Sequence, residues 1–358
     1  MKNECRRKFY TLPLFTVLIA VALLLGACTT PEKAKAQHVA RGQALLKDKK
    51  FQEASLEFRN ALQIDDKLAD AHWGLANSYE GLQRYQEAFE EMKQVVALDA
   101  NNLDVRVRLG NYYLMGGKQD PAAISEAEML AKAVLQKDPN HIEGHILMGS
   151  VLFAQEHKPE AFAELNRAIE LNPQRVESYL SMARFYALTN DNVTADATFH
   201  RAIAVNGASA LAHYEYGKYL VQTNRADAAE NEFQMAVQVD PNNREARFVL
   251  ASFYLVNKRL AKAEEAYKAL AELDKDKPEG RSVLGDFYGA TGRLDEAIAI
   301  YKEVITKSPD YTQGHYRLAE LMLNHGDMAN AKAEVDGILK KDAKDRQAMI
   351  LRARRIIA

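Results

Sequence analysis

The stretch LGDFYGATGRLDEAIAIYKEVITKSPD, residues 284–310, decides the fold because its pattern recurs along the chain. Its Ala297 belongs to a series of alanines spaced by 34 residues, with a single step of 39. Twelve residues before each alanine, or seventeen before Ala127, lies a glycine or another alanine. The series comprises Ala54, Ala88, Ala127, Ala161, Ala195, Ala229, Ala263, Ala297 and Ala331. The chain therefore repeats one design nine times, which predicts a repeat architecture.

Each unit is expected to form two packed helices. Small residues that face each other let two helices approach closely, while large apolar residues such as Phe58 and Tyr301 fill the space beside them. Turn signals such as LQR (82–84), TNR (223–225) and TGR (291–293) divide each unit into helices of about a dozen residues. Seven prolines fall at unit ends or at expected helix starts, and none after the signal lies inside an expected helix.

The units resemble tetratricopeptide repeats. The stretches LGNYY (109–113), LGDFY (284–288), RAIELNP (167–173) and AVQVDPN (236–242) fit the motif of that family. The resemblance implies an all-α fold, a right-handed α-solenoid of antiparallel helix pairs, in which each repeat is stabilised by its neighbours. The nine units are 35–68, 69–102, 103–141, 142–175, 176–209, 210–243, 244–277, 278–311 and 312–345. Residues 346–358 are expected to form a C-terminal capping helix, with Arg346, Arg352 and Arg355 facing water.

The first 27 residues are typical of a secretory signal. Basic residues precede an apolar segment from Leu14 to Leu25 that is too short to span a bilayer comfortably. The residues that end at Cys28 resemble the lipobox of bacterial lipoproteins, which implies cleavage before Cys28, lipidation of its thiol and a short tether over 28–34. By the same resemblance, Thr29 favours the outer membrane, facing the periplasm. The alternative is an uncleaved signal anchor with an incidental cysteine, which leaves the chain exported all the same.

The sequence gives no sign of an enzyme, a cofactor or a metal site. It lacks a Gly-rich phosphate loop, a GxSxG motif and, after Cys28, any cysteine nucleophile. In HIEGH (141–145), His141 is expected in a loop. His145 occupies the repeat position of His72, His213 and His315, which favours a structural or surface role over metal binding. Recurrent carboxylates at the second position of the first helices suit helix starts. With a formal net charge of −2, the chain is not expected to bind nucleic acid.

The resemblance places a partner-binding groove on the first helices of the repeats. In the family, their second, fifth, ninth and twelfth positions line the concave face, which commonly holds a partner segment. Carried over to this chain, that face is expected to include Trp73, Asn77, Val107, Asn111, Ile146, Leu180, Arg184, Tyr214, Lys218, Phe248, Asp286, Tyr316 and Glu320. Aromatic members are the expected anchors, and the polar row changes sign from Arg184 and Lys218 to Asp286 and Glu320. The alternative is that fifth-position residues only pack between neighbouring helices.

The third unit carries five extra residues, within GGKQDPAAISEAE. Asp120 as N-cap and Pro121 at the first helical position are expected to start its second helix early. Two interpretations stay open: a partner contact, or an insertion that the surface tolerates.

We therefore expect a lipid-anchored, periplasm-facing scaffold without enzymatic activity. Its partners would be envelope proteins, bound as extended or helical segments, in an exopolysaccharide export, secretion or pilus system. The alternative function is a glycan carrier in which Tyr214, Phe248 and Trp73 stack on sugar rings.

Overall fold

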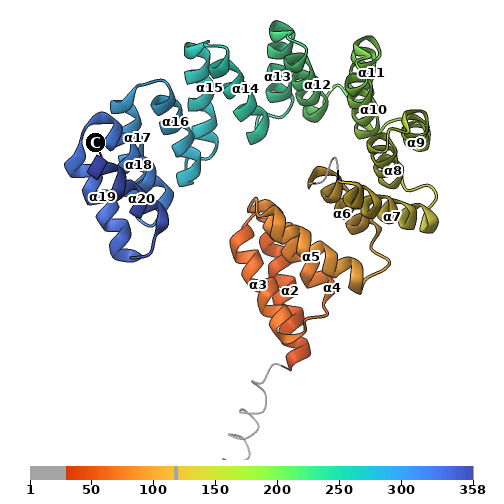
Figure 1. Cartoon of the computed structure of the whole chain (residues 1–358), viewed down its shortest axis with the longest axis horizontal. Coiled ribbons are helices and arrows are strands. Elements are labelled where there is room, and N and C mark those ends of the chain that lie inside the picture. The colour runs from red at the N-terminus through yellow and green to blue at the C-terminus, as the bar shows by residue number, and fades with distance from the viewer. Residues whose placement is uncertain (1–29, 117–119, 358) are drawn as a thin grey trace, which may run out of the picture. The chain divides into compact units, whose positions relative to one another are not determined.

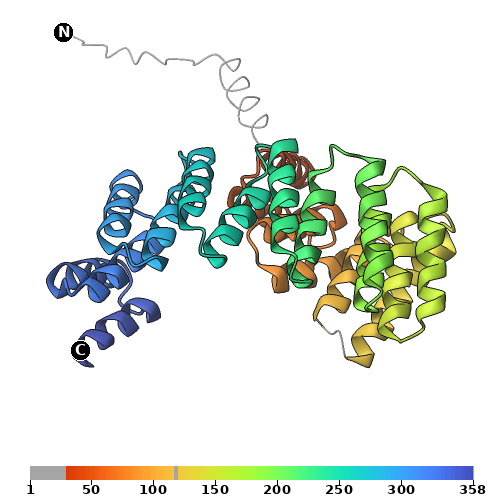
Figure 2. The same cartoon turned by 90° about the horizontal axis from the view of Figure 1, so that it is seen from above.

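The computed structural model describes residues 30–116 and 120–357, the last four of these by their backbone alone. Every regular element in these residues is an α-helix, and successive helices pack as pairs (Figures 1 and 2). The chain divides after Pro173 into two compact units, which we call unit 1 and unit 2. The all-α fold of helix pairs predicted from the repeat is confirmed.

Unit 1 contains the first four helix pairs. Its helices are α2 (Pro31–Lys47), α3 (Phe51–Ile64), α4 (Ala69–Gly81), α5 (Tyr85–Leu98), α6 (Leu103–Gly116), α7 (Pro121–Lys137), α8 (Ile142–Ala154) and α9 (Lys158–Leu171). The first helix begins at Pro31, four residues before the predicted start of the first unit. Thr30 caps it by accepting a hydrogen bond from the Lys33 backbone N–H, and the fixed φ of Pro31 suits a first helical position.

Unit 2 contains five helix pairs and a last single helix. Its helices are α10 (Val176–Leu188), α11 (Asn192–Val205), α12 (Ala210–Gln222), α13 (Ala226–Val239), α14 (Arg244–Val256), α15 (Leu260–Leu273), α16 (Pro278–Ala290), α17 (Leu294–Lys307), α18 (Thr312–His325), α19 (Met328–Lys341) and α20 (Arg346–Ile357). Helix α20 is the predicted C-terminal helix, and both Arg346 and Arg352 are exposed on it. The expectation for Arg355 lies outside the described side chains.

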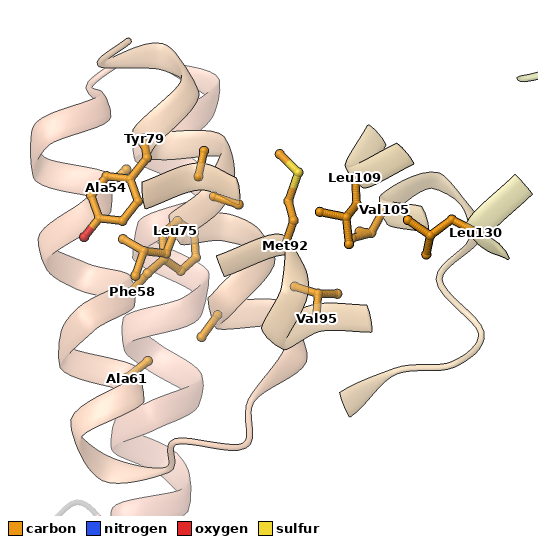
Figure 3. Close-up of a cluster of buried hydrophobic side chains, with 13 residues drawn as sticks. Ala54, Phe58, Ala61, Leu75, Tyr79, Met92, Val95, Val105, Leu109 and Leu130 are labelled. Carbon is orange, nitrogen blue, oxygen red and sulfur yellow. The ribbon is translucent and has the colours of Figure 1, made fainter. Parts of the chain in front are cut away.

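The repeating small residues act as contact points between helices, as predicted. Phe58 of α3 is fully buried among the apolar side chains of α3, α4 and their neighbours, where Figure 3 shows it beside Leu75. A Cβ atom added at Gly42 would lie 2.7 Å from the Phe58 ring, and one added at Gly74 would lie 2.2 Å from it. The ring therefore occupies space that α2 and α4 leave free only because both positions are glycine.

The described turns inside the helix pairs each use one residue in the left-handed region. Two of these residues are glycines, Gly292 and Gly326, and six are not glycine. The six are Lys49, Gln83, Glu156, Asn190, Asn224 and Lys258. Because a positive φ costs a residue with a Cβ free energy, these turns are held by the helices on either side.

The insertion in the third unit lengthens its second helix, as predicted. Helix α7 has 17 residues, against 14 for α5 and for α9. The side chain of Asp120 accepts a hydrogen bond from the Ala122 backbone N–H, and Pro121 is the first helical residue.

Candidate partner-binding surface

Five histidines at one repeat position hold the helices of a pair together. They are His38, His72, His145, His213 and His315, which we call the clamp histidines. In each, Nδ1 lies 2.5 to 2.7 Å from Oε2 of a glutamate 19 residues later, on the second helix of the pair. In four of them, Nε2 also lies 3.0 to 3.4 Å from a carbonyl oxygen of the loop before the first helix. The clamp thus joins two helices and a loop.

The charged form of the imidazole suits this geometry. A carboxylate and a carbonyl oxygen can only accept, so an imidazolium, which donates from both nitrogens, satisfies both contacts. The hydrogen bond to Glu91 raises the pKa of His72, and the hydrogen bond to Glu232 raises that of His213. This is the structural role expected for these histidines. His141, in turn, accepts a hydrogen bond from the Gly144 backbone N–H at the start of α8.

A second set of contacts links neighbouring pairs in unit 2. Arginines at the intra-pair turns reach carboxylates 29 residues earlier, on the second helix of the preceding pair. The contacts are Arg225–Asp196, Arg259–Glu230 and Arg293–Glu264, which we call the arginine ladder. Arg225 and Arg293 also lie over tyrosine rings of their own pairs, with guanidinium carbons 5.1 and 4.4 Å from the ring centroids. Hydrogen bonds from Lys268 and Arg293 lower the pKa of Glu264 to about 2.

In unit 1, the predicted anchor Trp73 is covered by a neighbouring repeat. The Arg108 guanidinium carbon lies 4.7 Å from the centroid of the Trp73 ring. Arg108 Nη1 donates to Asn77 Oδ1 and to Glu80 Oε2, each at 2.8 Å. Asn77 Nδ2 in turn donates to the Trp73 carbonyl at 2.8 Å. Trp73 and Asn77 are thus in contact with side chains of the same protein. Arg108 was not among the residues predicted from the sequence.

The remaining predicted residues of unit 1 do not form a continuous apolar row. Val107 is buried in a core cluster with residues of α7 and α8, and Ile146 is half-buried. Only Asn111 is exposed among the three. For Val107 the alternative that fifth-position residues pack between helices is the correct one.

In unit 2, Arg184 and Lys218 line one cavity of about 540 Å³. They occupy the ninth positions of α10 and α12, so the repeat brings two cations to one hollow. The other lining residues are Ala187, Leu188, Asn190, Asn192, Phe199, Glu215, Tyr219, Gln222 and Thr223. Lys218 Nζ lies 3.1 Å from Glu215 Oε1 on the same helix, while the Arg184 Nε–H donates to the Leu180 carbonyl at 3.3 Å. We call this cavity the basic pocket.

The predicted apolar row of unit 2 is reduced to one exposed ring. Leu180 and Tyr316 are buried, and the Tyr316 hydroxyl donates to Asp345. Tyr214 is half-buried: its hydroxyl donates to Glu245 Oε1 at 3.1 Å, and burial, with Glu245, raises its pKa to about 12. Phe248 alone is 43% exposed. The expectation that these residues form a row of accessible anchors is wrong for Leu180 and Tyr316, because neighbouring helices cover them.

The two acidic residues of the polar row, Asp286 and Glu320, are both close to one arginine of the same unit. Arg317 Nε lies 3.6 Å from Asp286 Oδ1, and Arg317 Nη1 lies 3.2 Å from Glu320 Oε2. The Tyr301 hydroxyl also donates to Asp286 at 2.7 Å. The predicted change of sign along the row is therefore weakened, since one arginine lies between the two acids. Arg317 and Arg108 share the sixth position of their first helices, one residue after the fifth positions that were predicted to line the groove.

Comparison with known families agrees with the repeat. Sequence models of the tetratricopeptide repeat match residues 39–103, 189–243, 217–278 and 290–354. Together these segments span more than half of the chain. The chain is a tetratricopeptide-repeat protein. No curated protein matches it significantly.

Several solved structures are similar to this tetratricopeptide-repeat chain. A thermophilic TPR protein of Thermus thermophilus is 18% identical and covers 52% of this chain and 99% of its own, with a TM-score of 0.45. PilF of Pseudomonas aeruginosa is 22% identical and covers 62% of this chain and 99% of its own, with a TM-score of 0.42. Yeast Tom70 is 16% identical and covers 92% of this chain and 89% of its own, also with a TM-score of 0.42.

Tetratricopeptide-repeat proteins generally act as scaffolds for protein–protein interaction. Within residues 30–116 and 120–357, no group of three or more histidine, cysteine or acidic side chains is placed to hold a metal ion. No helix in these ranges is long and apolar enough to cross a membrane. For glycan stacking, one face of the Tyr214 ring is already occupied by Lys218, whose Nζ lies 4.9 Å from the ring centroid. Trp73 is covered by Arg108 in the same way.

Proposed function

We propose that the protein is a non-enzymatic scaffold, lipid-anchored through Cys28 at the outer membrane and facing the periplasm. It binds segments of envelope proteins during assembly of an export, secretion or pilus machine. The repeat family supports a protein-binding role, and the lipobox-like residues before Cys28 support the anchor. Both Cys28 and the signal lie outside the described residues.

The basic pocket carries the proposal. Arg184 and Lys218 bring two positive charges to one hollow against the single carboxylate of Glu215, which leaves a net positive charge. Leu188, which also lines the hollow, is 66% exposed. A guanidinium binds carboxylates in a bidentate manner, and the amides of Asn192 and Gln222 can hydrogen-bond a peptide backbone. The fitting partner segment is therefore acidic, with an apolar side chain that covers Leu188.

Site-specific photo-crosslinking in living cells tests this. A photoreactive amino acid replaces Leu188 at the pocket, and in a matched strain it replaces Val256, the same repeat position on α14, which is 79% exposed. We expect one defined protein adduct from position 188 and none of that size from position 256. Equal adduct patterns from both positions would contradict the pocket as the binding site.

Charge reversal identifies the chemistry of the partner. Arg184→Glu combined with Lys218→Glu should abolish the adduct, because two attractive contacts become repulsive. The control is Lys332→Glu with Lys340→Glu, which changes the net charge equally at two exposed positions of α19. Loss of the adduct in both double variants would mean that net charge, not the pocket, is responsible.

The dependence of binding on ionic strength distinguishes a peptide partner from a glycan partner. Binding of an acidic partner segment to purified protein should weaken as salt is raised, since exposed charges are screened. Binding of oligosaccharides that is unaffected by salt and lost in Phe248→Ala would favour the carrier alternative instead.

The lipid anchor has its own test. Cys28→Ser should abolish incorporation of a labelled fatty acid and release the protein from the outer-membrane fraction. A Cys5→Ser variant is the matched control, because Cys5 lies within the signal. Membrane retention and labelling of the Cys28→Ser protein would refute lipidation at this residue.

A further inference from the structure

Unit 1 contains a second cavity, of about 750 Å³, far larger than a single side chain requires. It lies where α4 and α6 end and where α5 and α7 begin. Its walls include the rings of Tyr85, Phe89, Tyr112 and Tyr113. The Phe89 and Tyr113 rings meet edge to face with centroids 5.1 Å apart, and Phe89 and Tyr112 are stacked at 6.4 Å. We call this cavity the aromatic pocket; its volume is within the range of about 300–1,000 Å³ for binding sites.

The pocket leaves large apolar side chains open to solvent. Tyr85 is 57% exposed and Met115 is 75% exposed, and both line it. A contiguous apolar surface of this kind, rimmed by polar groups, marks an interaction site on a soluble domain. Aromatic rings and methionine are also the side chains that contribute most contact area at protein interfaces.

The charged groups among the described lining residues of the pocket are all acidic. They are Glu80, Asp120 and Glu126, and no lysine or arginine is among the described lining residues. Glu80 is already bonded to Tyr112 and to Arg108, and Asp120 caps α7. Glu126 is exposed and forms no ion pair within 4.0 Å among the described residues, although it interacts electrostatically with Lys93. The Lys93 ammonium, 5.5 Å from the Phe89 centroid, shows that a ring of this cluster already accepts a cation on one face.

We propose that the aromatic pocket docks a partner-protein segment in which lysine or arginine adjoins large aliphatic or aromatic side chains. The apolar side chains would cover Tyr85 and Met115, and the cation would face Glu126 and the ring faces. This site goes beyond the basic pocket: it lies in the other unit, and its charge selects a segment of opposite chemistry.

The proposal also assigns a role to the insertion in the third unit. The early start of α7 places Asp120, Ala122 and Ala123 in the wall of the pocket. A helix α7 that began a turn later, like the other second helices, would lack these residues. The extra residues thus build one side of a binding site.

Labelled peptide probes test the pocket by fluorescence anisotropy on the full chain carrying Arg184→Glu and Lys218→Glu, so that an acidic probe cannot bind at the basic pocket. The first probe is built from leucine and lysine, the second from leucine and glutamate, and the third from serine and lysine. We expect only the leucine–lysine probe to bind, because the site requires both an apolar surface and a cation. Equal binding of the leucine–glutamate or the serine–lysine probe would overturn the proposal, as would failure of all three to bind.

Variants then locate the bound probe. Tyr85→Ala and Met115→Ala, both at exposed positions that should leave folding intact, are expected to weaken the leucine–lysine probe about tenfold. Glu126→Lys should weaken it at least as much. The matched control is Glu160→Lys, an equal charge change at an exposed position of α9. Circular dichroism checks that each variant is folded.

Three results would overturn the assignment. One is unchanged affinity in folded Tyr85→Ala, and another is an equal loss in Glu160→Lys, which would indicate attraction by net charge alone. The third is sedimentation with phosphatidylcholine vesicles that depends on Tyr85 and Met115, which would make the surface a membrane contact. Arg184→Glu with Lys218→Glu should leave probe binding unchanged, so failure of the basic pocket and of the aromatic pocket can be told apart.

Discussion

Substitution of Gly74 by alanine should destabilise unit 1, although alanine is the better helix former. Alanine gains about 1 kcal/mol of helix propensity over glycine inside a helix. Its Cβ, however, would lie 2.2 Å from the Phe58 ring, which is fully buried and which Gly42 confines from the side of α2. Overpacking costs about 1–3 kcal/mol, and this close approach belongs at the upper end of that range. We expect a net loss of about 1–2 kcal/mol.

Urea denaturation followed by fluorescence measures this effect locally. Trp73 is the only tryptophan and lies next to Gly74, so its emission reports the unfolding of unit 1. The expected loss corresponds to a midpoint lower by roughly 1 M. In a Phe58→Leu background the same substitution should cost about 1 kcal/mol less, because the clashing ring is absent.

A glycine with open space around it provides the control. A Cβ at Gly337 in α19 would meet no atom within 4 Å, so Gly337→Ala should stabilise the chain by about 1 kcal/mol, as measured by circular dichroism. If Gly74→Ala left the Trp73 midpoint unchanged or raised it, the close packing of Phe58 against α4 would be refuted.

Two further predictions concern the turns and the clamp histidines. Lys258→Gly should raise the free energy of unfolding by about 1 kcal/mol, because Lys258 has a φ of 58°, which strains a residue with a Cβ. The control Lys332→Gly, inside α19, should lower the free energy of unfolding by about 1 kcal/mol. Equal effects of the two substitutions in urea denaturation, followed by circular dichroism, would show that the turn is not strained. The pKa of His213 is raised in the folded state, so its clamp contributes stability that is fully present below its unfolded pKa of about 6.5 and is lost as pH rises through the folded pKa. The denaturation midpoint of Glu232→Gln should therefore fall further below wild type at pH 5.5 than at pH 8.5, and a gap that does not depend on pH would contradict the charged clamp.

The repeat frame could be predicted because it rests on rules that act inside each unit. A small residue must face the large one within each unit, as Gly42 faces Phe58 and Gly217 faces Phe233, so the period of this small position survives in the sequence. Turn residues were predictable only in part. Asn224 and Gly292 are residue types that favour a positive φ, whereas Lys258 adopts one because the flanking helices impose it.

The surface could not be predicted in the same way, because it depends on long side chains from the next repeat. Arg108 covers Trp73 from 35 positions away, and Arg317 lies between Asp286 and Glu320. The repeat period predicts which positions face a groove, but it does not predict whether an arginine from the next repeat covers them. The aromatic pocket was missed for a related reason: its rings come from α5 and α6, outside the row that the resemblance singles out.

The clamp histidines make their contacts within one repeat, whereas the arginine ladder joins neighbouring repeats. This difference determines how the array can gain or lose a repeat. Each clamp histidine finds its glutamate within the same repeat, so a duplicated or deleted repeat would take its clamp with it, complete. The arginine ladder crosses between repeats, yet an acid occupies the same place in each, as Asp196, Glu230 and Glu264. A newly adjacent repeat would therefore offer the incoming arginine an equivalent carboxylate. Repeats 6 and 7, which each carry both the arginine and the acid, could therefore be copied or lost by recombination without leaving a charge unpaired.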